Sequence, residues 1–387
     1  MAFFANYPVA LASGMGLNAF FAFTVCGAMG YSYKVALTAV FIEGIIFMLL
    51  SLFKFREALV NKIPSNLKFA ITAGIGLFIA IIALLNANVV IASESTTVAL
   101  GELSSPTVVL SLVGLLIIGA LQHYKVPGGI LLGILITWVL GIIAQLVGWY
   151  VPNPEAGVYS VIPQFSLSSF EAPKMFQFDF GFIAKNVPAF ILIVFTFLYT
   201  DIFDTVGTLI GVAEKGKLLD QDGSLPNATG ALMADAVGTV VGACLGTSTV
   251  TSYVESSAGV AAGGRTGLTA VTTAVLFFIS LIFAPIFTSI PSFATTPAML
   301  YVGLLMLSSI RQVKFDGDIA DAIGAFLAII MMPLTYSIAN GIMFGIVSWV
   351  ILKLVTGKAK DISAVMWISV VSVSYTHLRA HETTLHL

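Results

Sequence analysis

The chain has 387 residues, of which 58% are hydrophobic and only 9% are charged. Soluble domains carry about a quarter charged residues, so this composition excludes an ordinary soluble protein and indicates an all-α polytopic membrane protein. The formal net charge of −2 argues against a nucleic-acid partner, because nucleic acids select strongly basic surfaces. Apolar runs of about 17–25 residues recur along the chain, as membrane helices require, whereas the strands of a closed barrel would be shorter and alternating.

Polar, proline and glycine clusters divide this apolar sequence into twelve predicted membrane segments. Most of them reach the length of about 20 residues that a helix needs to cross the hydrocarbon. The first and the eighth segments differ, because they are short, rich in glycine and preceded by turn-like sequence. The segments are expected at 14–30, 35–53, 67–86, 107–121, 128–150, 188–212, 228–246, 253–263, 267–290, 295–310, 319–336 and 338–356.

The loops between these segments differ in their content of Lys and Arg, which predicts the orientation. Cytoplasmic loops of membrane proteins carry an excess of these residues, and one set of alternate loops holds thirteen of them against three in the other set. The protein is expected in the inner or plasma membrane of the cell. The loops richer in Lys and Arg, and the C-terminal end of the last segment, are therefore expected on the cytoplasmic side. The loop 151–187 is then external, and its Phe-rich second half is interpreted as a short amphipathic piece at the interface.

Five carboxylates fall within the apolar segments, where a charge costs about 2.5–3.5 kcal/mol on insertion scales. Each of them therefore needs either a packing role or a functional one. For Glu43 and Asp235 a packing role is favoured, because Asp235 lies among spaced glycines that indicate close helix contact. Asp201 and Asp204 are three residues apart and share a helix face. The two roles stay open for Asp201, whereas a functional role is favoured for Asp204 and for Glu255.

The first and eighth segments share an interrupted design. In "TSYVESSAGVAAGG", 251–264, a polar β-branched run precedes a short helix that begins near Glu255. In "SGMGLNAFFAFTV", 13–25, a glycine break and Asn18 precede an apolar half-helix. Irregular backbone at membrane depth requires burial or a cavity, and a half-helix directs its free N–H groups and positive dipole end into that cavity. Such a pair in the two halves of a chain predicts a midplane site between inverted repeats; the alternative is two glycine-rich packing helices.

Three stretches, "GMGLNAFFAFTV", "TDIFDTVGTLIGVAEKGKLLD" and "GTSTVTSYVESSAGVAAGGRTGLTA", are similar to signatures of one transporter family. The chain resembles the AzgA-like purine permeases, for hypoxanthine, guanine and adenine, of the nucleobase/cation symporters, from about residue 5 to 373. This resemblance implies a fold of seven plus seven inverted repeats. In that fold, spans 1–4 and 8–11 form a substrate-holding core domain, and spans 5–7 and 12–14 form a gate domain.

The family plan assigns each part of the chain to a domain. The first segment matches the third span of the family, so the chain is interpreted as truncated at its N-terminus. The assignment is core domain for 1–53, gate domain for 54–150, external loop for 151–187, core domain for 188–290, gate domain for 291–357, interfacial segment for 358–373 and non-native tail for 374–387.

The tail "SYTHLRAHETTLHL" carries three of the four histidines. His377 and His381 are four residues apart and would share a metal ion on a helix. The abrupt change in composition instead favours a sequence foreign to the fold. No metal or cofactor is therefore expected.

The resemblance implies proton-coupled uptake of a purine nucleobase. A carboxylate accepts hydrogen bonds from the N–H groups of such a base, and backbone N–H groups donate to its carbonyl or ring nitrogens. The coupling proton is assigned to Asp204 first and to Asp201 second, with Glu255 as the third acid of the group, since buried neighbouring carboxyls hold protons. Phe20 and Phe21 are candidates for ring stacking, with apolar packing favoured for at least one. The match assigns to the substrate site Glu255, Asp204, Asn18, Gly16, Leu17, Ala19, Phe20, Tyr253, Val254 and Ser256.

Several other functions are weighed against this one. A carrier of uracil, xanthine or an anion would share the fold, but Glu255 would repel an anion at the half-helix. A non-functional fragment of a purine permease is a further alternative. A channel would need a continuous polar lining, and an enzyme would need a nucleophile with a base or a ligand cluster, which the sequence does not offer. The preferred purine stays open, and a homodimer is expected from the family fold alone.

Overall fold

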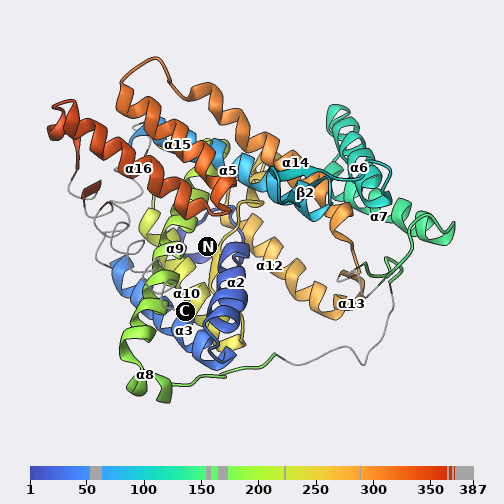
Figure 1. The fold of residues 1–387 in the computed structure, drawn as a ribbon, viewed down its shortest axis with the longest axis horizontal. Helices are drawn as coiled ribbons and strands as arrows, with labels where there is room; N and C mark the ends of the chain where they lie inside the picture. Colours follow the sequence, from blue (N-terminus) through green and yellow to red (C-terminus); the bar gives the residue numbers. More distant parts are fainter. Residues whose placement is uncertain are drawn as a thin grey trace. The chain divides into compact units, whose positions relative to one another are not determined.

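The structure is a computed structural model, and it describes residues 1–52, 63–153, 158–163, 173–221, 224–287, 289–363, 366, 367 and 370. In these parts the chain is almost entirely helical, with two short pairs of antiparallel strands (Figure 1). His377 and His381, and with them the predicted tail, lie outside the described residues.

A helix lies in each of the twelve predicted segments. The first is α2, Met15–Ala19, which continues as the π-helix η1, Phe20–Ala28. The largest shortfall is in the segment expected at 267–290, where α12 ends at Ile282 and Pro285, which has no N–H to donate, follows it. The other long helices are α3 (Tyr33–Leu52), α5 (Ser65–Asn86), α6 (Pro106–His123), α7 (Gly129–Leu146), α9 (Val187–Gly216), α10 (Ala228–Leu245), α12 (Gly267–Ile282), α14 (Ser292–Leu307), α15 (Ile319–Thr335) and α16 (Ile338–Val355).

Shorter elements connect these helices or interrupt them. They are α1 (Ala2–Ala5), β1 (Leu11–Ser13), β2 (Val90–Ser93), β3 (Thr97–Leu100), α8 (Gly181–Lys185), β4 (Val250–Ser252), α11 (Ser256–Ala261), α13 (Ala284–Phe287), η4 (Ser308–Gln312) and η5 (Ala359–Asp361).

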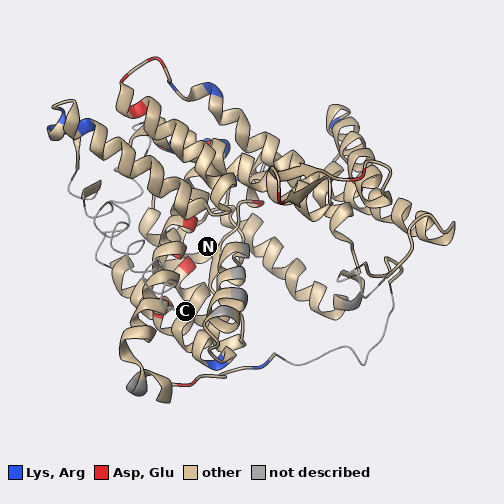
Figure 2. Ribbon diagram, in the orientation of Figure 1, with Lys and Arg blue, Asp and Glu red and all other residues tan. Residues whose placement is uncertain are grey.

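Within the described residues, eight helices are long and apolar enough to cross a membrane, and three further apolar helices are shorter. These lengths confirm a helical membrane protein, while the number of spans stays a prediction. Lys and Arg residues lie in loops and towards helix ends, whereas acidic residues also occur inside helices (Figure 2). This distribution follows from the cost of placing an unpaired charge in hydrocarbon.

The chain divides into two compact units, of which the first comprises Met1–Ile75, Pro173–Ala274 and Met306–Leu387. In this unit, small residues let helices approach closely, as is usual in membranes. A Cβ on Gly44 of α3 would lie 2.9 Å from the Cγ2 atom of Val240 in α10. A Cβ on Gly345 of α16 would lie 2.8 Å from the Cβ of Ala328 in α15.

The second unit comprises Gly76–Ala172 and Val275–Leu305. Here α6 packs on α7 and α14 in the same way, since a Cβ on Gly114 would lie 2.6 Å from the Cγ atom of Pro297. The hydroxyl of Ser111 donates to the carbonyl of Phe293 at 3.2 Å. The boundaries predicted for the domains stay a prediction.

Candidate functional site

The two interrupted segments meet as a pair of antiparallel strands in the first unit. β1 pairs with β4 so that Leu11 lies opposite Ser252 and Ala12 opposite Thr251. Backbone bonds continue the pairing beyond both ends, because the N–H of Gly14 donates to the carbonyl of Thr249 at 3.1 Å, and the N–H of Tyr253 donates to that of Ala10 at 2.9 Å. The extended segments thus satisfy the backbone groups of each other, as membrane depth demands.

The pairing is symmetric in sequence as well as in space. Gly14 and Tyr253 each follow their strand by one residue, and Ala10 and Thr249 each precede theirs by one. The two bonds that flank the strands therefore join equivalent positions of the two segments. This is the arrangement that a two-fold axis between inverted repeats produces.

Gly14 permits the close crossing. A Cβ at this position would lie only 2.7 Å from the Cγ2 methyl of Thr251. From the other side, α10 packs on β4 through Gly242, where a Cβ would lie 2.6 Å from the Cγ2 of Val250. Gly14 and Gly242 are therefore needed here because a larger side chain would clash with methyl groups of β4.

A buried network of carboxylates and hydroxyls supports β4. The carboxylate of Asp235 in α10 accepts hydrogen bonds from Ser252 Oγ at 3.0 Å and from Thr205 Oγ1 of α9 at 2.7 Å. The Thr205 hydroxyl also lies 3.3 Å from Asp201 Oδ1 and 2.9 Å from Thr251 Oγ1. Asp201, Asp235 and Thr205 are fully buried. Asp235 of α10 therefore connects this helix to α9 through the Thr205 hydroxyl and to β4 through the Ser252 hydroxyl.

Asp204 lies one helical turn further along α9 and faces the start of α16. The backbone N–H of Ala339, in the first turn of α16, points at its carboxyl group, whereas its Oδ1 atom is buried and has no hydrogen-bond partner in the described part of the chain. Gly207 lies on the same face of α9, and a Cβ there would lie 3.1 Å from Ile342 and 3.3 Å from Ile338 of α16. Asp204 is thus placed at a helix contact, next to the positive end of the α16 dipole.

Glu255 occupies the N-cap position of α11 and is half-buried. Its side chain makes no capping hydrogen bond. The first three N–H groups of α11 donate to the carbonyls of Tyr253, Val254 and Glu255 itself, at 3.0–3.1 Å. The structure differs here from the expectation of free N–H groups, because the chain enters α11 through a tight turn that uses them. The backbone N–H of Glu255 itself points at this carboxylate, which has further acceptor sites for another partner.

The neighbours of Glu255 take part in the crossing itself. Ser256 Oγ accepts the N–H of Ala10 at 2.9 Å, and the Tyr253 hydroxyl donates to the Ser13 carbonyl at 3.4 Å. Val254 is buried. Ser256 and Tyr253 therefore hold the two segments together, and contact of all three predicted site residues with a substrate stays a prediction.

Asn18 bridges the two interrupted segments with its exposed side chain. Its Nδ2 donates to Ser13 Oγ at 3.3 Å, and its Oδ1 accepts a hydrogen bond from the hydroxyl of Ser248, two residues before β4. Gly16 lies beside open space, where a Cβ would meet nothing within 4 Å. Leu17 is fully buried in the core of the unit.

The aromatic residues after Asn18 pack against α9. The rings of Phe20 and Phe197 meet edge to face with their centroids 4.9 Å apart. Phe21 is buried and lies 6.3 Å from the same ring of Phe197. These contacts provide apolar packing for both rings, and their predicted stacking on a substrate stays a prediction. Ala19 lies in α2 between them and Asn18.

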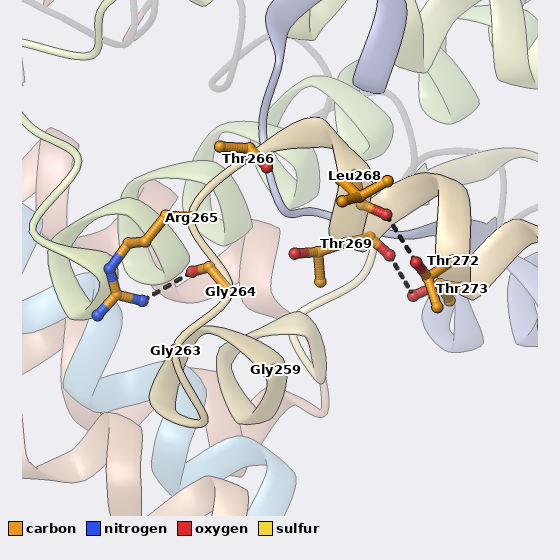
Figure 3. Close-up of a pocket in the computed structure, with 9 residues that line it drawn as sticks. All are labelled: Gly259, Gly263, Gly264, Arg265, Thr266, Leu268, Thr269, Thr272 and Thr273. Carbon is orange, nitrogen blue, oxygen red and sulfur yellow. Dashed lines mark hydrogen bonds between the residues drawn. The ribbon is translucent and has the colours of Figure 1, made fainter.

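A hollow of about 600 Å³ lies beyond the C-terminal end of α11 (Figure 3). Arg265 donates to the carbonyls of Val260 at 2.6 Å and Gly264 at 2.7 Å, so it caps α11. Figure 3 shows its guanidinium directed away from the threonines of α12. The hollow lacks an acid among its lining residues, which are Gly259, Gly263, Gly264, Arg265, Thr266, Leu268, Thr269, Thr272 and Thr273. The acids inside the first unit therefore define the better candidate site.

In the described ranges, no group of three His, Cys, Asp or Glu side chains is arranged to hold a metal ion. The sequence did not single out Ser252 or Thr205 as members of the network, or Ser248 as a partner of Asn18. The polar run "GTSTVTS", 246–252, was a signal for the two serines, but their partners on other elements are set by tertiary packing.

Comparison with known proteins identifies the kind of protein to which this site belongs. The model of Xan_ur_permease, described as a permease family, matches residues 1–344. The chain belongs to this family. It is therefore a membrane transport protein and not an enzyme.

Three relatives illustrate the similarity along the sequence. A putative permease of Methanocaldococcus jannaschii is 44% identical over 368 residues, which are 95% of this chain and 81% of that protein. The guanine/hypoxanthine permease PbuG of Bacillus subtilis is 42% identical, over 95% of this chain and 80% of the relative. The adenine permease AdeQ of Escherichia coli is 41% identical, over 94% and 78%.

Solved structures support the fold. The transmembrane domain of a cyanobacterial bicarbonate transporter, BicA, superimposes with a TM-score of 0.59 at 16% identity, covering 87% of this chain and 85% of that one. The structure of SLC26A9 superimposes with a TM-score of 0.53 at 10% identity, covering 91% and 58%. The permease therefore has the inverted-repeat transporter fold with core and gate parts.

Proposed function

We propose that this permease is a secondary active transporter that takes up purine nucleobases together with protons. The observation that carries the proposal is the crossing of β1 and β4. Glu255 follows β4 at the start of α11, and its carboxylate makes no capping hydrogen bond to that helix. The relatives named for guanine, hypoxanthine and adenine support the substrate class. Hypoxanthine and guanine are the first candidates, and adenine is the next.

The proposed recognition uses groups of both polarities. Glu255 accepts from ring or exocyclic N–H groups of the base, and the amide of Asn18 offers both a donor and an acceptor. A hydrogen bond to a charged group contributes about 1.5–3 kcal/mol, which corresponds to at least about tenfold in affinity. Glu255 is therefore proposed as the principal anchor of the base.

The proposed coupling uses Asp204, with Asp201 or Glu255 next in order. Asp204 has no ion-pair partner in the described part of the chain, so its proton can leave and return without breaking a salt bridge. Alternating access then follows from movement of the core domain against the gate domain around the site. A cytoplasmic C-terminus in the cell membrane and assembly as a homodimer belong to the same proposal.

Uptake by vesicles that contain the purified protein tests this function. Labelled hypoxanthine, guanine and adenine are compared with uracil, xanthine and bicarbonate, with and without an inward proton gradient. We expect accumulation of hypoxanthine, guanine or adenine only with the gradient, and binding of that base weaker by about tenfold or more in Glu255→Ala. Uptake of uracil, xanthine or bicarbonate in place of hypoxanthine, guanine and adenine, or unchanged affinity for these three bases in Glu255→Ala, would contradict the assignment.

A further inference from the structure

The bridge made by Asn18 breaks the symmetry of the crossing. Asn18 follows the last residue of β1 by five positions, and the equivalent residue after β4 is Ser257. Ser248 precedes the first residue of β4 by two positions, and the equivalent residue before β1 is Val9. Val9 has no polar side-chain atom, so no second bridge of this kind forms.

The equivalent residue Ser257 behaves differently from Asn18. Its hydroxyl is buried and has no hydrogen-bond partner in the described part of the chain. The amide of Asn18, in contrast, is held at both of its polar ends, at Nδ2 by Ser13 and at Oδ1 by Ser248. The fold repeats the backbone pairing in both halves but builds this side-chain bridge only once, which indicates a specialised role.

Among the residues that the structure describes, the two hydroxyls leave half of the hydrogen-bonding capacity of the Asn18 amide unused. A carboxamide has two donors on nitrogen and two acceptor sites on oxygen, and the two serines use one of each. The Asn18 side chain is exposed, whereas Ser248 is buried. One N–H and one acceptor site of the Asn18 amide therefore remain for a ligand. The position of the amide is fixed by its hydrogen bond with the buried Ser248.

We propose that Ser248, with Ser13 opposite, is a positioning residue that holds the Asn18 amide in place to read the polar edge of a purine base. This inference rests on the proposed function, and it adds Ser248 as a residue that influences the affinity of the protein for the purine base. A hydroxyl either donates or accepts, so the two serines hold the amide in either of its two orientations. The bridge therefore serves 6-oxo purines, with a ring N–H beside a carbonyl, and 6-amino purines, with the reverse order of donor and acceptor.

The test compares the KM and the maximal rate of base uptake between wild type and single variants of the full chain. In Ser248→Ala we expect the KM for the transported purine to rise about 2- to 10-fold, as for the loss of one hydrogen bond, with a maximal rate within about twofold of wild type. Ser248→Thr retains the hydroxyl and should restore the wild-type KM. Ser257→Ala is the matched control and should leave the KM unchanged.

Several outcomes would overturn the inference. They are an unchanged KM in Ser248→Ala, a failure of Ser248→Thr to restore it, or an equal rise in Ser257→Ala. If Ser248→Ala does not reach the membrane, Ser13→Ala tests the other end of the bridge with the same criteria. A wild-type protein that takes up no purine would instead contradict the proposed function, so the two failures are distinguishable.

Discussion

At the scale of single residues, the site depends on side chains that are small enough to let two backbones cross. Gly14 has φ −66° and ψ 132°, angles that any L-residue adopts. Its requirement for glycine is therefore steric, and it arises from the methyl of Thr251 at 2.7 Å from the missing Cβ.

This steric account predicts a specific rescue. Gly14→Ala should destabilise the protein by about 1–3 kcal/mol, the usual cost of overpacking, and should lower uptake. Thr251→Ser removes the clashing methyl but keeps the hydroxyl that lies 2.9 Å from Thr205. The double variant should recover most of the lost melting temperature and uptake, as measured on purified protein and in vesicles. If the double variant has the same melting temperature and uptake as Gly14→Ala alone, contact with Thr251 does not limit the size of the side chain at position 14.

At the scale of secondary-structure elements, α15 and α16 form a helical pair that is closed by charges at one end. Asp318 is the N-cap of α15, and its Oδ1 accepts the N–H of Ala320 at 3.0 Å. Its Oδ2 lies 2.7 Å from the Nζ atoms of both Lys353 and Lys358. Hydrogen bonds from Lys353, and then from Lys358, hold the pKa of Asp318 well below its usual value.

This shift predicts a dependence of stability on pH. A carboxyl whose folded pKa is depressed stabilises the protein above its unfolded pKa, near 4, and loses this effect as the pH falls towards the folded pKa. Asp318→Asn keeps the cap but not the charge, so its melting temperature should be lower than wild type at pH 7. The difference should narrow below about pH 4. Asp316→Asn, at an exposed neighbour, is the control and should melt as wild type at both pH values; a pH-independent difference for Asp318→Asn would contradict the account.

Secondary structure was largely predictable at this scale, because hydrophobic length and glycine breaks are local properties. The break before Glu255 and the break before Asn18 were both visible in the sequence. The pairing of β1 with β4 was not, since it joins residues more than two hundred positions apart. A packing role was predicted for Asp235, but its partners Ser252 and Thr205 were not, because helix packing sets them.

At the scale of the whole molecule, the predicted transport cycle alternates between outward-open and inward-open states. It requires contacts that change when the core domain moves against the gate domain. Asp204 is placed for such a contact, since α9 belongs to the predicted core and α16 to the predicted gate. Its carboxyl group faces the N–H of Ala339 and the positive end of α16. The carboxyl group of Asp235 is close enough to interact electrostatically with it. An ionised Asp204 attracts α16, and a protonated one does so less. The state of one proton can therefore favour one arrangement of the two domains.

This argument predicts which step Asp204→Asn disturbs. Asparagine retains the shape of the side chain and a hydrogen-bond acceptor, but it cannot carry the proton, so accumulation of base driven by a proton gradient should stop. Exchange of labelled for unlabelled base across the vesicle membrane should continue, because it needs binding and movement but no net proton transfer. Asp204→Glu, which still titrates, is the matched control and should keep part of the accumulation. Gradient-driven accumulation with wild-type pH dependence in Asp204→Asn would place the coupling proton elsewhere, with Asp201 and Glu255 as the next residues to change.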